Sequence, residues 1–279
     1  MTKTFCVSAL VLVSLLAAPL ASTATAQQAK GLTQELVAVQ VRPGVTVSYL
    51  GLVAPAKPSA AVVLLAGGQG LLSLGQAGSI GTDLRRNFLI RSRELFALQG
   101  FYVAALDAAS DLDEGMNGAY RLSLRHAREL GHVIAHLKGR LGVPVWLVGT
   151  SSSTLSVASA GARLPAASLP RPDGIVMTSS MTELTPYCLK SVYDAPLSAI
   201  RGPVLVVSHR DDGCACTPGS AAAGSRLLAA LTSASAKEHK VFNGGLPPVS
   251  GPCAARAPHG FFGIEDRVVK WIADWIRAR

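Results

Sequence analysis

A serine that could act as a nucleophile lies in residues 143–153, Val-Pro-Val-Trp-Leu-Val-Gly-Thr-Ser-Ser-Ser. The apolar run predicts a strand, the small polar residues predict a sharp turn, and residues 154–160, Thr-Leu-Ser-Val-Ala-Ser-Ala, predict a helix. A serine at such a turn is held in a strained conformation that exposes its hydroxyl above the positive end of the helix. This arrangement, a nucleophile elbow, favours Ser151 as a nucleophile. The pattern Gly-x-Ser-x-Gly is only half met, because Ser153 stands at the second glycine, and a helix N-cap is the alternative role for the serine.

A serine nucleophile needs a base to take its proton and an acid to orient that base. Residues 204–214, Val-Leu-Val-Val-Ser-His-Arg-Asp-Asp-Gly-Cys, predict a strand followed by a turn that returns Asp212 over the strand end. Asp211 is the alternative acid, because strand ends shift by a residue or more in such predictions. Turn capping is the other role open to either aspartate. Among six histidines, His259 in the loop Ala-Pro-His-Gly-Phe-Phe before the last helix is the preferred base.

The tetrahedral intermediate of acyl transfer also needs two backbone N–H donors for its oxyanion. Ser152, the residue after the nucleophile, is expected to supply one of them. The loop Ala-Gly-Gly-Gln-Gly at 66–70 follows an apolar strand, and Gly68 or Gln69 is expected to supply the other. The loop lacks the Gly-Lys-Ser/Thr ending and the Gly-x-Gly-x-x-Gly spacing of phosphate-binding loops. Histidine and cysteine spacing does not favour a metal site, and the chemistry requires no cofactor.

Short apolar runs alternate with longer amphipathic ones, a pattern typical of a mainly parallel sheet with helices on both faces. The residues from 27 to 279 are expected to form one α/β domain. The first two strands are separated by Arg-Pro-Gly at 42–44 and predict an antiparallel hairpin at the sheet edge. The segment 180–202 is too short for a large lid. The eight predicted strands are 36–41, 45–52, 61–66, 101–107, 145–149, 174–179, 203–208 and 238–243, and the predicted helices are 83–98, 120–140, 152–163, 220–232 and 264–278.

Residues 1–26 resemble a secretory signal peptide. Lys3 begins the segment, residues 6–20 are almost wholly apolar, and Ala-Thr-Ala at 24–26 offers a cleavage site. The apolar run is short for a membrane span, so no stable span is expected after cleavage, and an uncleaved anchor is the alternative. The mature protein is therefore expected in the periplasm or outside the cell.

Cysteines 188, 214, 216 and 253 would remain in the exported chain, where disulfides can form. A bond between Cys214 and Cys216 would close too tight a ring. Two pairings stay open: 188–216 with 214–253, or 188–214 with 216–253. Either would tie the loop after residue 208 to the loop before His259. Free buried thiols are the alternative.

The basic charge is spread along the chain. Removal of Lys3 with the signal lowers the formal net charge from +9 to +8. Arginines 85, 86, 91, 93, 121, 125 and 128 lie among apolar residues at helical spacing, which predicts solvated helix faces. No arginine-rich run or basic stripe with aromatic residues favours nucleic-acid binding.

These residues together resemble the α/β-hydrolase superfamily over almost the whole mature chain, and an exported branch of it. The resemblance is carried by 66–70, by Asn-Phe-Leu-Ile-Arg-Ser-Arg at 87–93, by Asp107, and by segments 145–151, 209–214 and 258–261. It implies Ser151 as nucleophile, Asp212 as acid and His259 as base. Asn87, Arg91 and Asp107 have no place in that triad. They are expected either to form a polar network beside the site, with Arg91 a candidate for an anionic substrate group, or to be a helix surface and a strand-end cap.

The resulting prediction is an exported serine hydrolase that cleaves an ester, thioester or related acyl bond of a small-molecule substrate through an acyl-enzyme on Ser151. One alternative is a peptidase on the same scaffold. Another is a hydrolase-like binding protein without turnover, which the altered position 153 favours and the intact serine, acid and histidine oppose.

Overall fold

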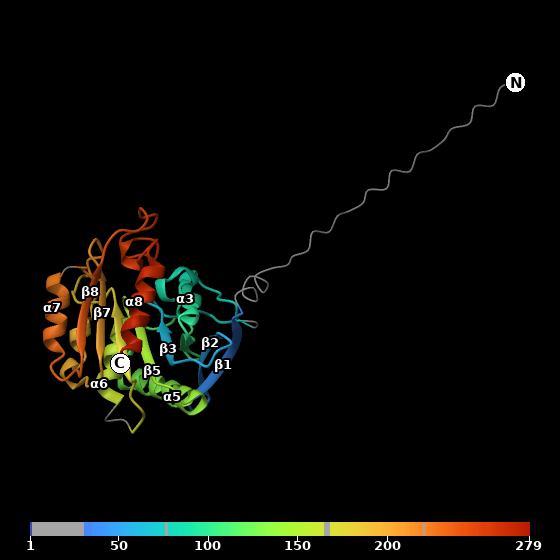
Figure 1. Ribbon diagram of the computed structural model, residues 1–279, viewed down its shortest axis with the longest axis horizontal. Coiled ribbons are helices and arrows are strands. Elements are labelled where there is room, and N and C mark those ends of the chain that lie inside the picture. The colour runs from blue at the N-terminus through green and yellow to red at the C-terminus, as the bar shows by residue number, and fades with distance from the viewer. Residues whose placement is uncertain (2–30, 76–77, 165–167, 220) are drawn as a thin grey trace.

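Among the described residues, eight strands form one sheet in the order β1-β2-β4-β3-β5-β6-β7-β8 (Figure 1). The computed structural model describes residues 1, 31–75, 78–164, 168–219 and 221–279. The pairs β1–β2 and β2–β4 are antiparallel, and the remaining pairs are parallel. The strands are β1 (Thr33–Arg42), β2 (Val45–Val53), β3 (Ala60–Leu65), β4 (Phe101–Ala109), β5 (Val145–Thr150), β6 (Gly174–Thr178), β7 (Val204–His209) and β8 (Lys237–Phe242). The predicted mixed, mainly parallel sheet with an antiparallel hairpin at its edge is confirmed.

Helices cover both faces of this sheet. On one face, α5 (Leu124–Leu141), α6 (Ser153–Arg163) and α7 (Ala221–Ala230) contribute to one hydrophobic cluster. On the other face, α2 (Phe88–Arg91), α3 (Arg93–Leu98) and α8 (Glu265–Arg277) contribute to another. Strands β3 to β7 are buried on both sides, because apolar side chains leave both faces of each strand.

Two predicted helices are interrupted by capping side chains. The predicted helix 83–98 is three pieces: a 3₁₀ helix η2 (Asp83–Arg86), then α2, then α3. Asn87 ends the first and caps the second, because its side-chain oxygen accepts the N–H of Leu89 at 3.1 Å. In the same way, Ser123 separates α4 (Gly118–Arg121) from α5 and accepts the N–H of His126. Polar residues that bond to nearby backbone compete with a continuous helix, which explains both breaks.

The parallel strands bring the carboxyl ends of β3, β5 and β7 to one edge of the sheet, where the candidate site residues follow. Between β6 and β7, residues 179–203 contain only the 3₁₀ helices η4 (Val192–Asp194) and η5 (Leu197–Ala199), so no lid domain is inserted there. The predicted signal peptide, apart from Met1, lies outside the described residues. No helix in the described ranges combines the length and apolar character needed to cross a bilayer.

The prediction of solvated arginine faces is wrong for Arg121. Arg121, the last residue of α4, is fully buried. The short helix α4 runs beneath the loop that follows β3, and the side chain points into the protein toward that loop and toward α6. The helical spacing correctly predicted that Arg121 lies in a helix. It could not show that the side of the helix that carries Arg121 is buried.

Candidate active site

Ser151 lies at a sharp turn between β5, which ends at Thr150, and α6, which begins at Ser153. Its φ of 56° lies in the left-handed region that non-glycine residues rarely adopt. The Ser151 N–H donates to the carbonyl of Thr178 at 3.0 Å, and the Ser151 carbonyl accepts from the N–H and hydroxyl of Thr154. A Cβ on Gly149 would lie 2.6 Å from Val157 Cγ2, so only glycine allows the strand to pack this closely on the helix. The predicted elbow is therefore present in the backbone.

Ser153 fills the position of the missing glycine with a bonded hydroxyl. The side chain is fully buried, and its Oγ accepts the N–H of Thr150 at 2.7 Å. The same Oγ lies 2.7 Å from the carbonyl oxygen of Leu65 and 2.9 Å from that of Thr150, and it donates its proton there. Ser153 thus links the end of β3 to the elbow, and the departure from the glycine pattern adds hydrogen bonds at the turn.

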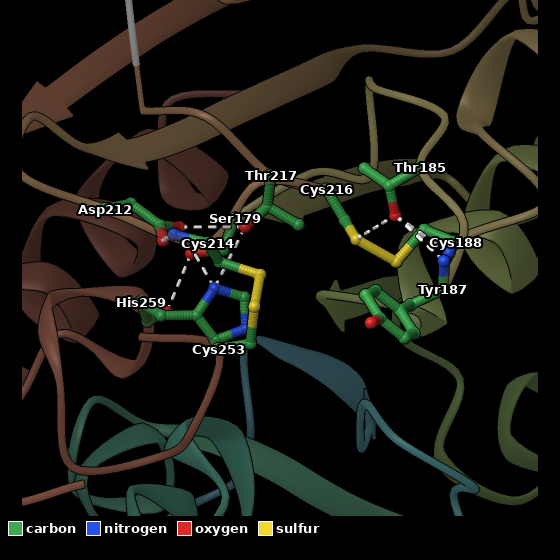
Figure 2. The surroundings of a disulfide bond; sticks show 10 residues. All are labelled: Ser179, Thr185, Tyr187, Cys188, Asp212, Cys214, Cys216, Thr217, Cys253 and His259. Atoms are coloured by element: carbon green, nitrogen blue, oxygen red, sulfur yellow. Dashed lines mark hydrogen bonds and ion pairs between the residues drawn. A yellow bond between two sulfur atoms is a disulfide. The ribbon is translucent and has the colours of Figure 1, made fainter. Parts of the chain in front are cut away.

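The predicted acid, Asp212, and the predicted base, His259, lie side by side (Figure 2). Asp212 Oδ2 lies 3.0 Å from His259 Nδ1, and the carboxylate side chain is fully shielded from solvent. Asp212 Oδ1 accepts the N–H of Cys214 at 2.9 Å. Asp211 instead forms a surface ion pair with Arg210 and has a side chain 49% exposed. The structure therefore places Asp212, and not Asp211, beside the histidine.

A threonine hydroxyl that sequence analysis did not single out joins this pair. Thr217 Oγ1 donates to Asp212 Oδ2 at 3.0 Å and lies 3.0 Å from His259 Nδ1. The residue is buried, and Figure 2 shows its side chain directed at the aspartate and the imidazole. Because His259 Nδ1 contacts both Asp212 and Thr217, Nε2 is the ring nitrogen that remains for proton exchange. The available signal was the position of Thr217 in the short loop after the acid, next to Cys216.

The histidine loop is held from two sides. His259 lies in the 3₁₀ helix η6 (Pro258–Gly260), and its carbonyl accepts the hydroxyl of Ser179 at 2.8 Å. The next carbonyl, that of Gly260, accepts Nη2 of Arg91 at 2.6 Å. Arg91 also bonds to Glu265 Oε1 at the start of α8. Arg91 therefore belongs to a polar network that fixes the histidine loop, and it does not line the cavity described below.

Asn87 and Asp107 have backbone partners. Asn87 caps α2, as described above. Asp107, two residues before the end of β4, accepts the N–H groups of Leu72 at 2.6 Å and Leu74 at 2.9 Å. It thereby fixes the course of the chain a few residues beyond Gly70. The expected polar network is present for Arg91, and Asp107 is a strand-end cap for the loop after β3.

Ser151 and His259 line one cavity of about 330 Å³. Apolar walls come from Leu84, Phe88, Ala254 and Ala255, and two arginines, Arg86 and Arg256, lie at its edge. Asn87 and Cys253 also reach it. Within the described chain no hydrogen bond joins the Ser151 hydroxyl to His259. Proton transfer between them thus requires Oγ and Nε2 to approach when a substrate enters, as is common for unliganded sites.

The predicted oxyanion donors lie beside the elbow. Gly67 approaches it so closely that a Cβ there would be 2.9 Å from the Thr150 carbonyl oxygen and 3.0 Å from Ser151 Cβ. The Ser152 hydroxyl donates to the Gly68 carbonyl at 2.8 Å and joins the loop to the elbow. In the part of the chain that the structure describes, the backbone N–H groups of Gly68, Gln69 and Ser152 bond to no protein acceptor. Gly68 lines the cavity and Gln69 does not, which favours Gly68 as the donor from this loop.

The disulfides follow one of the two predicted pairings. Cys188 bonds to Cys216, and Cys214 bonds to Cys253. The second bond joins the loop of the acid to the loop that leads to His259 (Figure 2). Cys253 also lines the cavity. The first bond holds the segment after β6 against the same acid loop. Together they fix the short stretch from Asp212 to Thr217 at two points.

No cluster of three histidine, cysteine, aspartate or glutamate side chains that could hold a metal occurs among the described residues.

No protein-family model matches the sequence, and no curated protein matches it. Solved structures match in fold. An esterase from Pyrococcus furiosus aligns with a TM-score of 0.62 at 10% identity over 90% of this chain and 93% of its own. A dienelactone hydrolase from Anabaena variabilis aligns with a TM-score of 0.58 at 15% identity over 89% and 98%. A cold-adapted esterase from an Arctic intertidal metagenomic library aligns with a TM-score of 0.56 at 14% identity over 88% and 94%. Strand order, elbow and these likenesses show that the chain has the α/β-hydrolase fold.

Proposed function

We propose that this protein is an exported serine hydrolase that cleaves an ester, thioester or related acyl bond through an acyl-enzyme on Ser151. The observation that carries the proposal is the buried contact of 3.0 Å between Asp212 and His259, on a histidine that shares a cavity with the strained Ser151. A hydroxyl, an imidazole and a carboxylate in this relation are the components of nucleophilic acyl transfer. The esterases and the dienelactone hydrolase that share the fold are consistent with this chemistry.

In the first step, His259 Nε2 takes the proton of the Ser151 hydroxyl as Oγ bonds to the substrate carbonyl carbon. The carbonyl electrons move to its oxygen, and the N–H groups of Ser152 and Gly68 bind the resulting oxyanion. Asp212 stabilises the imidazolium through Nδ1. The bond to the leaving group then breaks, and the leaving group departs with the proton from His259. Water repeats the sequence on the acyl-enzyme: it gives a proton to Nε2, attacks the carbonyl carbon and releases the acid and the Ser151 hydroxyl.

The cavity supports a small acyl substrate. Its volume of about 330 Å³ and its walls of leucine, phenylalanine and alanine suit a short apolar group. The disulfides support an oxidising compartment, in agreement with the export signal predicted for residues 1–26. We place the mature protein in the periplasm or outside the cell.

Covalent labelling tests the nucleophile. Purified protein is exposed to a fluorophosphonate probe and compared with the variants Ser151→Ala and Ser250→Ala. Ser250 is the matched control, because it is a serine that lines the same cavity and lies outside the proposed triad. We expect the wild type and Ser250→Ala to be labelled and Ser151→Ala to be unlabelled. An unlabelled wild type, or a labelled Ser151→Ala, would overturn the assignment and favour a binding protein without turnover.

A comparison of an ester substrate with an anilide substrate tests whether the protein is an esterase or a peptidase. We expect p-nitrophenyl acetate to be hydrolysed with a much higher kcat/KM than the corresponding p-nitroanilide. Faster hydrolysis of the anilide by the wild type, lost in Ser151→Ala, would replace the esterase proposal with a peptidase.

A further inference from the structure

Arg121 is a buried cation without a buried anion. Its side chain is fully inaccessible to solvent, and no carboxylate of the described residues lies within ion-pair distance. Burial lowers the pKa of Arg121 to about 9, so the guanidinium keeps its charge at neutral pH. Moving a charge out of water without an opposite charge costs several kcal/mol in general. Apolar residues at such positions often give equal or greater stability, so fold stability alone does not account for an arginine here.

The guanidinium is bonded to the two segments that supply the oxyanion donors. Nη2 donates to the carbonyl of Gly68 at 2.9 Å and lies 3.3 Å from that of Ala66. Nη1 donates to the Ser156 hydroxyl at 3.0 Å, on the helix that begins beneath the elbow. One rigid planar group therefore spans the loop after β3 and helix α6.

The contacts with the loop fix the peptide that presents the Gly68 N–H. The carbonyls of Ala66 and Gly68 belong to the peptide groups on either side of the Gly67–Gly68 peptide, and both are turned toward Arg121. The Gly68 N–H belongs to the peptide between them. Gly68 adopts a φ of 58°, and because glycine has no Cβ, its backbone can take up conformations that other residues cannot. The hydrogen bonds from Arg121 remove that freedom on both sides of the donor.

A nearby residue of the same chain, Gly70, leaves space for the Arg121 guanidinium. A Cβ on Gly70 would lie 2.7 Å from Arg121 Nη2 and 2.6 Å from Met116 Cε. The charge also acts on its surroundings, because it contributes to the lowered pKa of His126 after the larger effect of burial. In a low-dielectric interior, a positive charge stabilises a nearby developing anion more strongly than it would at the surface, where water screens the attraction.

We propose that Arg121 is a positioning residue for acyl transfer, which fixes the Gly68 N–H toward the oxyanion and adds a positive potential behind that loop. This rests on the proposed function, since it assigns Arg121 to the oxyanion step of the same site. A direct oxyanion donor contributes about 10²–10³-fold to kcat. A residue that acts through the loop contributes less, and we expect roughly 10- to 100-fold, in line with one or two charge-assisted hydrogen bonds.

The test compares Arg121→Met and Arg121→Lys with a matched control, Arg93→Met. Arg93 is half-buried and also donates to a backbone carbonyl, that of Ile90, but it lies on α3 outside the cavity. Three quantities are measured on each folded variant: kcat and KM for p-nitrophenyl acetate, and the inhibition constant of phenylboronic acid. The adduct of this acid with a serine has a tetrahedral boron, and one of its oxygens takes the place of the oxyanion. The free energy of unfolding is measured separately by urea denaturation.

In Arg121→Met we expect kcat to fall roughly 10- to 100-fold with KM nearly unchanged. The boronic acid inhibition constant should rise in the same proportion, and Arg93→Met should match the wild type in all three quantities. A folded Arg121→Met that keeps the wild-type kcat and boronic acid affinity overturns the proposal. So does a loss of kcat without a loss of boronic acid affinity, which a structural role would produce.

Arg121→Lys decides the question if the methionine variant does not fold. Lysine keeps the charge, but its three donors sit on one nitrogen at the end of a flexible chain, so it does not reproduce the rigid fork in which Nη1 bonds to Ser156 and Nη2 to the Gly68 carbonyl. Parallel losses of kcat and boronic acid affinity support the positioning role, and wild-type values for both overturn it. The proposed function fails separately, by the absence of fluorophosphonate labelling in the wild type.

Discussion

Substitution of Ser153 tests whether its hydroxyl stabilises the elbow in place of the second glycine. In Ser153→Ala, the buried N–H of Thr150 loses its acceptor, and the bond donated to the Leu65 or Thr150 carbonyl is also lost. An unsatisfied buried donor costs about 1–3 kcal/mol, and a lost hydrogen bond costs about 1 kcal/mol. The better helix propensity of alanine offsets up to about 0.5 kcal/mol. We expect a net loss of about 2–3 kcal/mol in the free energy of unfolding.

Ser153→Gly restores the common motif and should be the less stable variant. It loses the same hydrogen bonds and adds about 1 kcal/mol for glycine in a helix relative to alanine. Ser159→Ala is the matched control, because Ser159 is a buried serine of the same helix. Its hydroxyl donates one hydrogen bond, to the Leu122 carbonyl. We expect it to lose about 1 kcal/mol.

Urea denaturation followed by circular dichroism at pH 7.5 measures these differences, and kcat for p-nitrophenyl acetate is measured on the same preparations. For a domain of this size, the loss in Ser153→Ala corresponds to a Tm lower by roughly 4–12 °C. The reasoning is refuted if Ser153→Gly is as stable as the wild type, or if Ser153→Ala and Ser159→Ala are equally destabilised. Either result would mean that the hydroxyl only occupies space at the turn.

Three further changes have expected outcomes. Thr217→Val removes a donor to the buried Asp212 carboxylate and should lower kcat/KM by roughly 10- to 100-fold, whereas Thr217→Ser should retain most of it, as steady-state kinetics would show. Replacement of both cysteines of either disulfide by alanine should lower the free energy of unfolding by about 4 kcal/mol. Only loss of the Cys214–Cys253 bond should also lower kcat strongly, because only that bond joins the acid loop to the histidine loop. Burial lowers the pKa of His126 below its ordinary 6.5, so the unfolded chain takes up the proton first. The free energy of unfolding should therefore be highest above pH 6.5 and decrease as the pH falls below it, less steeply in His126→Gln, as urea titrations across pH 5–8 would show.

The strands could be predicted from the sequence because each is a short apolar run, buried on both faces and bounded by turn residues. The ends of β5 and β7 then located Ser151 and Asp212, since side chains that follow parallel strands meet at one edge of the sheet. Helix boundaries were harder to predict from the sequence. The periodicity of residues 83–98 fits one helix, but Asn87 bonds to its own backbone and divides it.

The contacts of Arg121 and Thr217 could not be predicted, for two different reasons. Arg121 has the helical spacing of a surface residue, and its partners in the loop after β3 are more than 50 positions away in the chain. Thr217 lies only five residues from the acid, but its direction depends on the disulfides, and the sequence left two pairings open. In both cases the decisive contact is made by a segment whose position the local sequence does not determine.

The sheet and its connections determine where the three proposed catalytic residues lie, but contacts outside the sheet determine their orientation. Ser151 is held by Thr154, Asp212 by Thr217, and the His259 carbonyl by Ser179. Each of these is a hydroxyl whose loss removes one or two hydrogen bonds, a small part of the stability of the whole fold. Activity should therefore be lost by changes that leave the strands and both hydrophobic clusters intact. The same reasoning explains how remote sequences with 10–15% identity keep this fold, because the apolar pattern of the strands tolerates substitution.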